Sequence, residues 1–160
     1  MPVSASSGCA GYKLGPTNGM TAGSRTVKFK PFINRTQEPR VTEYLSISLR
    51  KQLQKDGTFR LETSGSPDIL VSGEVLRLDR SGLSYLTNDV LTPQEYTLTM
   101  QARVTAVNVS TGKTFINRTI QGFTYIHMGN DEYSVERQAI PLLTDDLARS
   151  AISLLVDGSW

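Results

Sequence analysis

Residues 96–106 alternate apolar and polar side chains without a break, and this pattern constrains the fold more than any other stretch of the chain. The apolar set is Tyr96, Leu98, Met100, Ala102, Val104 and Ala106, and Thr, Gln or Arg fills every position between them. A period of two residues is typical of a β-strand that buries one face and exposes the other. The sequence therefore predicts a long antiparallel strand whose second face is polar and solvated.

A turn and a returning strand follow this segment. Residues 110–113 include a glycine that can adopt a positive φ, and residues 114–125 carry the apolar side chains expected of a partner strand. A four-residue loop would place Met100 opposite Phe123, with Tyr125 on the same buried face two residues further on. We therefore expect aromatic and aliphatic cross-strand contacts to hold this hairpin in register.

Two amphipathic helices are predicted from the period of 3.6 residues. The first begins near Glu38-Pro39 and ends at Gly57, and its apolar stripe is Val41, Leu45, Leu49 and Leu53. The second follows residues 130–131, and its stripe is Val135, Ala139, Leu143, Leu147, Ala151 and Leu154. Pro141 lies inside the second segment and should kink or divide that helix.

The remaining apolar segments complete the predicted fold. Further strands are expected at residues 26–33, 58–63 and 69–78, and Pro31 indicates an edge position or a bulge in the first of them. The predicted class is α+β: a two-layer sandwich with two amphipathic helices on one face of a mixed, mostly antiparallel sheet of four or five strands. Residues 1–25, rich in Ser, Gly, Ala and Thr, are expected to form a flexible tether, and residues 26–160 a single domain.

The composition is that of an ordinary globular protein, with 38% hydrophobic and 20% charged residues. No apolar run approaches the roughly 20 residues that a transmembrane helix needs. Cys9 is the single cysteine, so an internal disulfide is excluded. Because Cys9 follows Gly8 and other small residues, it has two interpretations: a lipidated lipoprotein cysteine, or a chance residue in a disordered tail.

Few residues suggest catalysis. His127 is the only histidine, so neither a histidine-based triad nor a zinc-binding His/Cys cluster can be assembled. Asp145 and Asp146 are adjacent on a predicted helix and are interpreted as solvated residues, while His127 is expected to be a strand-end residue with a local hydrogen bond. We therefore predict a protein that is not an enzyme and has no cofactor.

Basic residues are the remaining signal. Ten of the 17 Lys and Arg residues lie within the first 60 positions, and four others, Arg77, Arg80, Arg103 and Arg118, lie on or near the predicted polar face. No row of aromatic side chains accompanies them, which disfavours nucleic acid as a ligand. A phosphorylated lipid or an acidic protein would suit these charges equally.

Seven short motifs occur in a familiar order and spacing. They are CAGY at residues 9–12, VKFKPFINRT at 27–36 followed by Glu38-Pro39, GTFRL at 57–61, DILVSGEV at 68–75, EY at 95–96, TGK at 111–113 and the terminal Trp160. From Cys9 to its end the chain resembles the LptE family of lipopolysaccharide-assembly lipoproteins.

This resemblance implies a lipoprotein of the Gram-negative cell outer membrane, anchored through Cys9 on the periplasmic face. Such a protein is a plug inside an LptD-type β-barrel partner, binds lipopolysaccharide and helps it reach the outer leaflet. Basic contacts in the family lie at the hairpin end and before the last helix, but residues 86–90 and 128–131 contain no Lys or Arg here. Arg77, Arg80 and Lys113 are the nearest substitutes and are the expected lipopolysaccharide-binding residues.

Two other classes remain open. Another periplasmic lipoprotein, such as a peptidoglycan-synthase activator or a secretion-pore component, is the main alternative, because β-α-β starts of that kind also use an Asn-Arg-Thr turn after a strand. A lipid-processing enzyme is the third class, and its candidate residues would be His127, Asp131 and Asp145.

Overall fold

The computed structural model describes residues 21–86, 89–127 and 132–158, with the backbone alone for 83–86, 89–94 and 132–133. Cys9 and Trp160 therefore lie outside the described residues. The elements in chain order are β1 (Thr26–Phe29), β2 (Ile33–Asn34), α1 (Val41–Asp56), β3 (Arg60–Leu61), β4 (Ile69–Leu86), β5 (Asp89–Asn108), β6 (Thr114–His127) and α2 (Glu132–Val156). The predicted succession of strands and helices is confirmed, except that the first predicted strand is divided.

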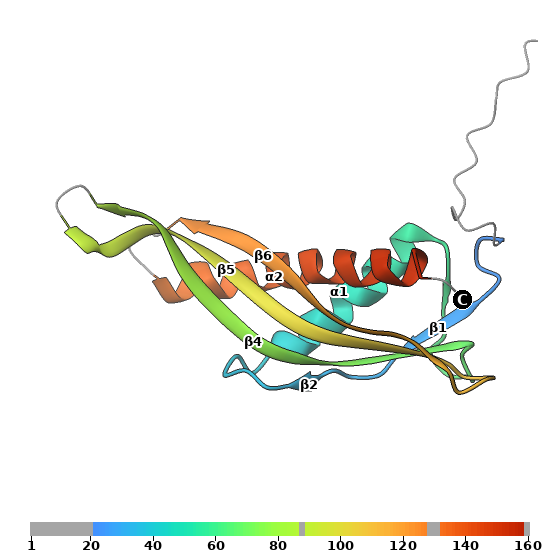
Figure 1. The fold of residues 1–160 in the computed structure, drawn as a ribbon. Coiled ribbons are helices and arrows are strands. Elements are labelled where there is room, and N and C mark those ends of the chain that lie inside the picture. Colours follow the sequence, from blue (N-terminus) through green and yellow to red (C-terminus); the bar gives the residue numbers. More distant parts are fainter. Residues whose placement is uncertain (1–20, 87–88, 128–131, 159–160) are drawn as a thin grey trace, which may run out of the picture.

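The strands form one six-stranded sheet in the order β3-β1-β4-β5-β6, with β2 also paired to β4. β1 runs parallel to both of its neighbours, whereas β4, β5 and β6 form an antiparallel meander. Figure 1 shows these three long, twisted strands extending well beyond β1 and β2. The mixed, mostly antiparallel sheet is confirmed. Its extra strand arises where Pro31, which has no N–H to donate, separates β1 from β2, and β1 lies inside the sheet rather than at its edge.

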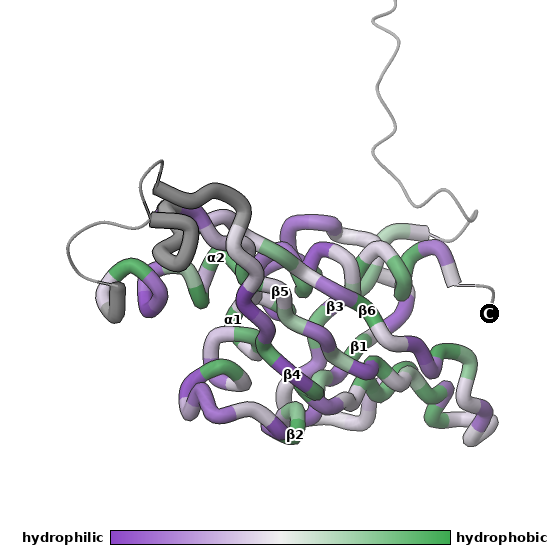
Figure 2. The backbone as a smooth tube through the Cα atoms, turned by 60° about the vertical axis from the view of Figure 1, so that its left-hand side comes forward, coloured by the Kyte–Doolittle hydropathy of each residue, from purple (hydrophilic) through white to green (hydrophobic). Residues whose placement is uncertain are grey.

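Both helices lie on the same side of the sheet (Figure 1). The predicted stripe of α1 is fully buried, and four of the six stripe residues of α2, namely Ala139, Leu143, Leu147 and Ala151, are buried as well. They share one hydrophobic core with the buried side chains of β5, which are Leu98, Met100, Ala102, Val104 and Ala106. Hydrophobic and hydrophilic residues accordingly alternate along β5 (Figure 2). The two-layer α+β class is confirmed.

The ends of α1 follow from local chemistry. Gly57 has a φ of 76°, and its N–H donates to the Leu53 carbonyl at 3.1 Å, which satisfies a carbonyl of the last turn. Glycine adopts this left-handed conformation without the steric cost that a Cβ would add. At the other end the helix starts at Val41, two residues after Pro39.

Pro141 does not divide α2, which is assigned as one continuous helix over 25 residues. Proline removes one backbone donor from the helical ladder, but its ring lies on the exposed face of α2. The Thr144 hydroxyl donates to the Pro141 carbonyl at 3.0 Å, and the Thr144 and Ser48 hydroxyls lie 3.3 Å apart. The turn after the proline is thus connected to α1 by side chains.

The pairing of β5 with β6 differs by one residue from the predicted register. Phe123 lies opposite Thr99 and Tyr125 opposite Thr97, so neither ring is paired with Met100. Because side chains alternate between faces, a one-residue slip moves both rings to the polar face of the sheet. Phe123 is accordingly 52% exposed and Tyr125 64% exposed.

A β-bulge near the turn produces this slip. Ala106 pairs with Ile116, but the next residue, Val107, pairs with Thr114, so β6 holds one extra residue at this point. The connection is also longer than predicted. The last residues that pair between β5 and β6 are Val107 and Thr114, so residues 108–113 connect the two paired segments. Loop length and bulge together set the register of the whole hairpin.

Candidate functional site

A cleft opens where β2 stops pairing with β4. The last residue of β4 paired to β2 is Val75, so the outer edge of β4 is uncovered from residue 76 onwards. The cleft has a volume of about 470 Å³. Its walls are the loop 35–38 after β2, residues 76–80 of β4, and Glu136 and Arg137 of α2.

Four arginines from three separate segments line this cleft: Arg35, Arg77, Arg80 and Arg137. Three of them are held by carboxylates, in the pairs Arg35–Glu74 at 3.4 Å, Arg77–Asp79 at 3.0 Å and Arg80–Glu136 at 3.1 Å. Each of these three side chains is nevertheless about 60% exposed, so its guanidinium keeps donors available. Arg137 has no acidic partner among the residues that the structure describes.

A tight turn fixes Arg35 beside β4. The Asn34 carboxamide oxygen accepts hydrogen bonds from the Thr36 N–H at 2.9 Å and the Thr36 hydroxyl at 2.8 Å, and the Asn34 amide donates to the Glu38 carbonyl. The Arg35 N–H donates to the Val75 carbonyl. The Asn-Arg-Thr sequence therefore forms an Asx turn that presents Arg35 to the cleft.

The structure brings together two of the three basic residues predicted from the sequence. Arg77 and Arg80 line the cleft, but Lys113 lies in the turn between β5 and β6. Asn108, at the start of that turn, pairs with Ile69 at the beginning of β4, eight residues along the strand from Arg77, so Lys113 lies well away from the cleft. Figure 1 shows the turn between β5 and β6 at one end of the sheet. One ligand headgroup in the cleft could not also contact Lys113.

Sequence reasoning missed Arg35 and Arg137 as partners of Arg77 and Arg80. The Asn-Arg-Thr turn was a usable signal for Arg35, because such turns fix the position of the residue they contain. No local signal marks Arg137, whose place beside β4 depends on how α2 docks across the sheet.

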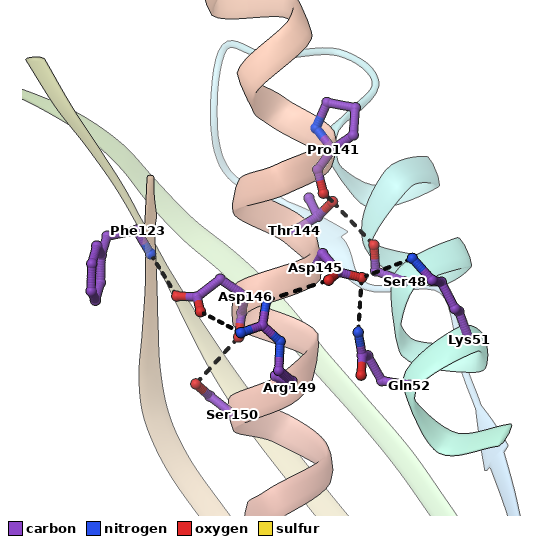
Figure 3. A network of polar contacts seen from close by, with 10 residues as sticks. All are labelled: Ser48, Lys51, Gln52, Phe123, Pro141, Thr144, Asp145, Asp146, Arg149 and Ser150. Carbon is purple, nitrogen blue, oxygen red and sulfur yellow. Dashed lines mark hydrogen bonds and ion pairs between the residues drawn. The ribbon is translucent and has the colours of Figure 1, made fainter. Parts of the chain in front are cut away.

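Two adjacent carboxylates on α2, those of Asp145 and Asp146, point in different directions and contact the two neighbours of this helix (Figure 3). Asp145 accepts a hydrogen bond from the Gln52 amide at 2.9 Å and lies 3.5 Å from the Lys51 ammonium, both on α1. Asp146 accepts a hydrogen bond from the backbone N–H of Phe123 on β6 at 3.0 Å. The pair thus ties α2 to α1 on one side and to the edge of the sheet on the other.

These contacts correct the interpretation of Asp145 and Asp146 as solvated residues, since their side chains are only 25% and 29% exposed. Burial alone would raise the pKa of Asp145. The hydrogen bond from Gln52, the Lys51 charge and the hydrogen bond from Arg149 outweigh burial and hold the pKa of Asp145 below its usual range. This carboxylate is therefore an ionised structural group.

His127 is a strand-end residue with a local partner, as predicted: its Nδ1 lies 3.0 Å from the Glu95 carboxylate. Among the residues that the structure describes, no group of His, Cys, Asp and Glu side chains could hold a metal ion. No helix within the described ranges is both long enough and apolar enough to cross a membrane.

Solved structures with the same fold include bacterial lipoproteins. The hypothetical protein CT253 from Chlamydia trachomatis is 14% identical, with a TM-score of 0.58, covering 85% of this chain and 96% of its own. A minor lipoprotein from Acinetobacter baumannii is 17% identical, with a TM-score of 0.53 and coverage of 82% and 92%. The PelC dodecamer from Paraburkholderia phytofirmans is 14% identical, with a TM-score of 0.53 and coverage of 84% and 89%. No curated protein matches the sequence.

These comparisons place the chain in a class of small α+β proteins in which two helices cover one face of a twisted sheet. Its family follows from the sequence itself. Residues 24–155 match the model of the LptE family of lipopolysaccharide-assembly proteins, and the chain belongs to this family. The resemblance drawn from the seven sequence motifs is confirmed.

Proposed function

We propose that this chain is an outer-membrane lipoprotein, anchored through Cys9 on the periplasmic face, that plugs an LptD-type β-barrel and binds lipopolysaccharide during its assembly. Family membership supports the role in lipopolysaccharide assembly. The arginine-lined cleft is the observation that carries the lipopolysaccharide-binding part of the proposal.

The chemistry of the cleft suits a phosphorylated lipid headgroup. Guanidinium groups bind phosphate oxygens through paired, charge-assisted hydrogen bonds. Four guanidinium groups line the cleft, whereas the acidic side chains that line it are two, Glu38 and Glu136. The wall of the cleft therefore carries a net positive charge. A phosphate can therefore be bound while the existing ion pairs keep the arginine side chains in place.

We further propose that the role is one of binding and assembly rather than catalysis. Within the described residues, the Glu136 carboxylate at the cleft accepts a hydrogen bond from Arg80, and no serine or cysteine lines the cleft beside a base. His127 lies near the far end of β6 in a contact with Glu95. Substitution of His127 should accordingly leave the binding of a phosphate group in the arginine-lined cleft unchanged.

The partner is tested by purifying the tagged, full-length chain from detergent-solubilised outer membranes and identifying bound proteins by mass spectrometry. A stoichiometric β-barrel of the LptD type is the expected result. Recovery of a peptidoglycan synthase, or of a ring of this chain alone, would replace the proposal with the alternative of another periplasmic lipoprotein.

The lipopolysaccharide site is tested with two double variants of equal charge. Arg77→Gln with Arg80→Gln should weaken lipopolysaccharide binding, whereas Arg60→Gln with Arg118→Gln, outside the cleft, should not. Lys113→Gln, measured alone, tests whether the turn between β5 and β6 makes a separate contact. Equal affinity of the two double variants at low salt would remove the cleft from the binding site.

A further inference from the structure

The face of the sheet that the helices leave uncovered carries three rows of side chains across β4, β5 and β6. Opposed residues of antiparallel strands lie on the same face. The rows are Ser81–Thr97–Tyr125, Asp79–Thr99–Phe123 and Arg77–Gln101–Gln121. We call these nine residues the sheet platform. Seven of them are polar, and the other two are the exposed aromatic residues.

The two aromatic rings form a pair at the β6 side of the platform. Their centroids are 5.9 Å apart with an interplanar angle of 74°, which is an edge-to-face arrangement. In this geometry one ring meets its neighbour with an edge, so the faces of the pair are not stacked on each other. With Tyr125 64% and Phe123 52% exposed, much of this aromatic surface is open to a ligand.

The surroundings of the rings distinguish a sugar from a protein partner. A protein interface of standard size buries a broad patch with an apolar core. Here the neighbours across the sheet are hydroxyl, amide and carboxylate side chains, without an aliphatic residue in the three rows. Such groups donate to and accept from the hydroxyl groups of a sugar, while the C–H bonds on the apolar face of a pyranose meet the electron-rich face of an aromatic ring.

Two features extend the platform at its ends. Beside Tyr125, a small cleft of about 300 Å³ is lined by Glu95, Tyr125, Ile126 and His127. At the other end, Arg77 belongs both to the platform and to the arginine-lined cleft. Phe123 and Asp79 are two strand spacings apart, about 10 Å, so a short oligosaccharide could contact the rings and reach the cleft.

We infer that the sheet platform is a saccharide-binding site, in which Tyr125 and Phe123 stack on a pyranose ring and the polar rows bind its hydroxyl groups. The site accepts the sugar portion of the ligand whose phosphate occupies the arginine-lined cleft. This second statement rests on the proposed function, whereas the stacking of a sugar on the aromatic pair does not.

The first experiment measures binding of a deacylated and dephosphorylated lipopolysaccharide oligosaccharide to the full-length protein by NMR titration. Shifts of the backbone amides of Thr97, Thr99 and Gln121 are expected. Tyr125→Ala should weaken binding about tenfold or more, equivalent to one stacking contact. Tyr125→Phe keeps the ring and should retain the affinity. Tyr125→Leu keeps an apolar side chain without a ring and should lose it.

Three results would overturn the inference. They are no binding by the wild-type chain at millimolar oligosaccharide, equal binding by Tyr125→Ala, and full retention of affinity by Tyr125→Leu, which would indicate general apolar contact. Binding of a peptidoglycan-derived glycan in place of the lipopolysaccharide oligosaccharide would overturn the connection between the platform and the cleft.

The Arg80→Gln, Arg137→Gln double variant, whose two positions line the arginine-lined cleft and lie outside the sheet platform, separates this inference from the proposed function. Because the probe carries no phosphate, its affinity should change less than about twofold in the double variant. If intact lipopolysaccharide also binds the double variant normally, the proposed cleft is wrong while the saccharide site stands. Loss of oligosaccharide binding in the double variant would overturn a saccharide site centred on the aromatic pair.

Discussion

Gly122 of β6 lies directly beneath Leu147 of α2. A Cβ added at Gly122 would lie 2.7 Å from the Leu147 backbone nitrogen and 2.9 Å from its Cα. The contact is with backbone, so the helix itself would have to move away from the sheet. Gly122→Ala is therefore expected to lower the free energy of unfolding by about 1–3 kcal/mol. Urea denaturation measures this loss, and the exposed Thr119→Ala variant is the control. Equal denaturation midpoints of Gly122→Ala and the wild type would contradict the close approach of α2 to β6.

The alternation of β5 predicts opposite outcomes for two neighbouring positions. Met100 is fully buried beneath the helices, whereas Gln101 lies on the polar face beside Arg77. Met100→Asp buries a carboxylate without a partner and should cost about 4 kcal/mol or more, while Gln101→Asp should change stability by less than about 0.5 kcal/mol. Thermal unfolding measures both. Similar melting temperatures would mean that β5 is not half-buried.

The lowered pKa of Asp145 predicts a pH dependence of stability. A carboxylate whose folded pKa is depressed contributes stability above its ordinary pKa of about 4, and this contribution is lost as the pH falls through the folded value. Asp145→Asn should thus be less stable than the wild type by about 1 kcal/mol at pH 7. The difference should disappear in strong acid. Denaturation between pH 2 and pH 7 tests this expectation, and the exposed Glu43→Gln variant is the control. A stability difference between Asp145→Asn and the wild type that stays constant with pH would contradict it.

Asp146 should protect one particular amide of the edge strand. Its carboxylate accepts the N–H of Phe123, a donor that points away from β5. Asp146→Ala is expected to speed hydrogen exchange of the Phe123 amide about five- to tenfold. Asp145→Ala, which removes a carboxylate directed at α1, should leave that amide unchanged. Identical exchange of the Phe123 amide in both variants would show that the contact with Asp146 gives no protection.

Arg137 offers the cleanest single test of the cleft, because its substitution breaks no ion pair within the described residues. Arg137→Gln should weaken lipopolysaccharide binding at low ionic strength, and the difference from the wild type should shrink near 1 M salt, where the Debye length is about 3 Å. Binding measured across a salt series gives both values. An effect that is independent of salt would indicate a structural role for Arg137 instead of a charge contact.

The features predicted correctly from the sequence are those that short segments encode. The stripe from Val41 to Leu53, the helix end at Gly57 and the alternation of residues 96–106 each reflect the geometry of a single element. Residues 69–78 also change apolar phase midway, from Val71 and Val75 to Leu76 and Leu78, and the register of β4 against β5 shifts at this place, between Val75 and Arg77. Local periodicity is sufficient to locate such features.

The register of β6 could not be obtained in the same way. Phe123 and Tyr125 lie on one face of β6, and Ile116, Ile120 and Ile126 lie on the other, so the hydrophobic pattern of this strand is compatible with either face being buried. The choice is made by the bulge near the turn and by the need for Gly122 beneath α2, which is a tertiary contact.

The cleft was only partly predictable for a related reason: Arg35 and Arg137 come from opposite ends of the chain and meet only after α2 docks.

The place of β1 in the sheet has a consequence for folding kinetics. Its neighbours come much later in the chain, as shown by the hydrogen bond between Thr26 and Asp68, 42 residues apart. The hairpins of β4, β5 and β6, in contrast, join consecutive segments. Loop-closure entropy favours the consecutive pairings first. Although β1 is synthesised early, we expect it to be among the last strands to pair, so the N-terminal part of the domain should stay unpaired until the rest of the sheet has formed.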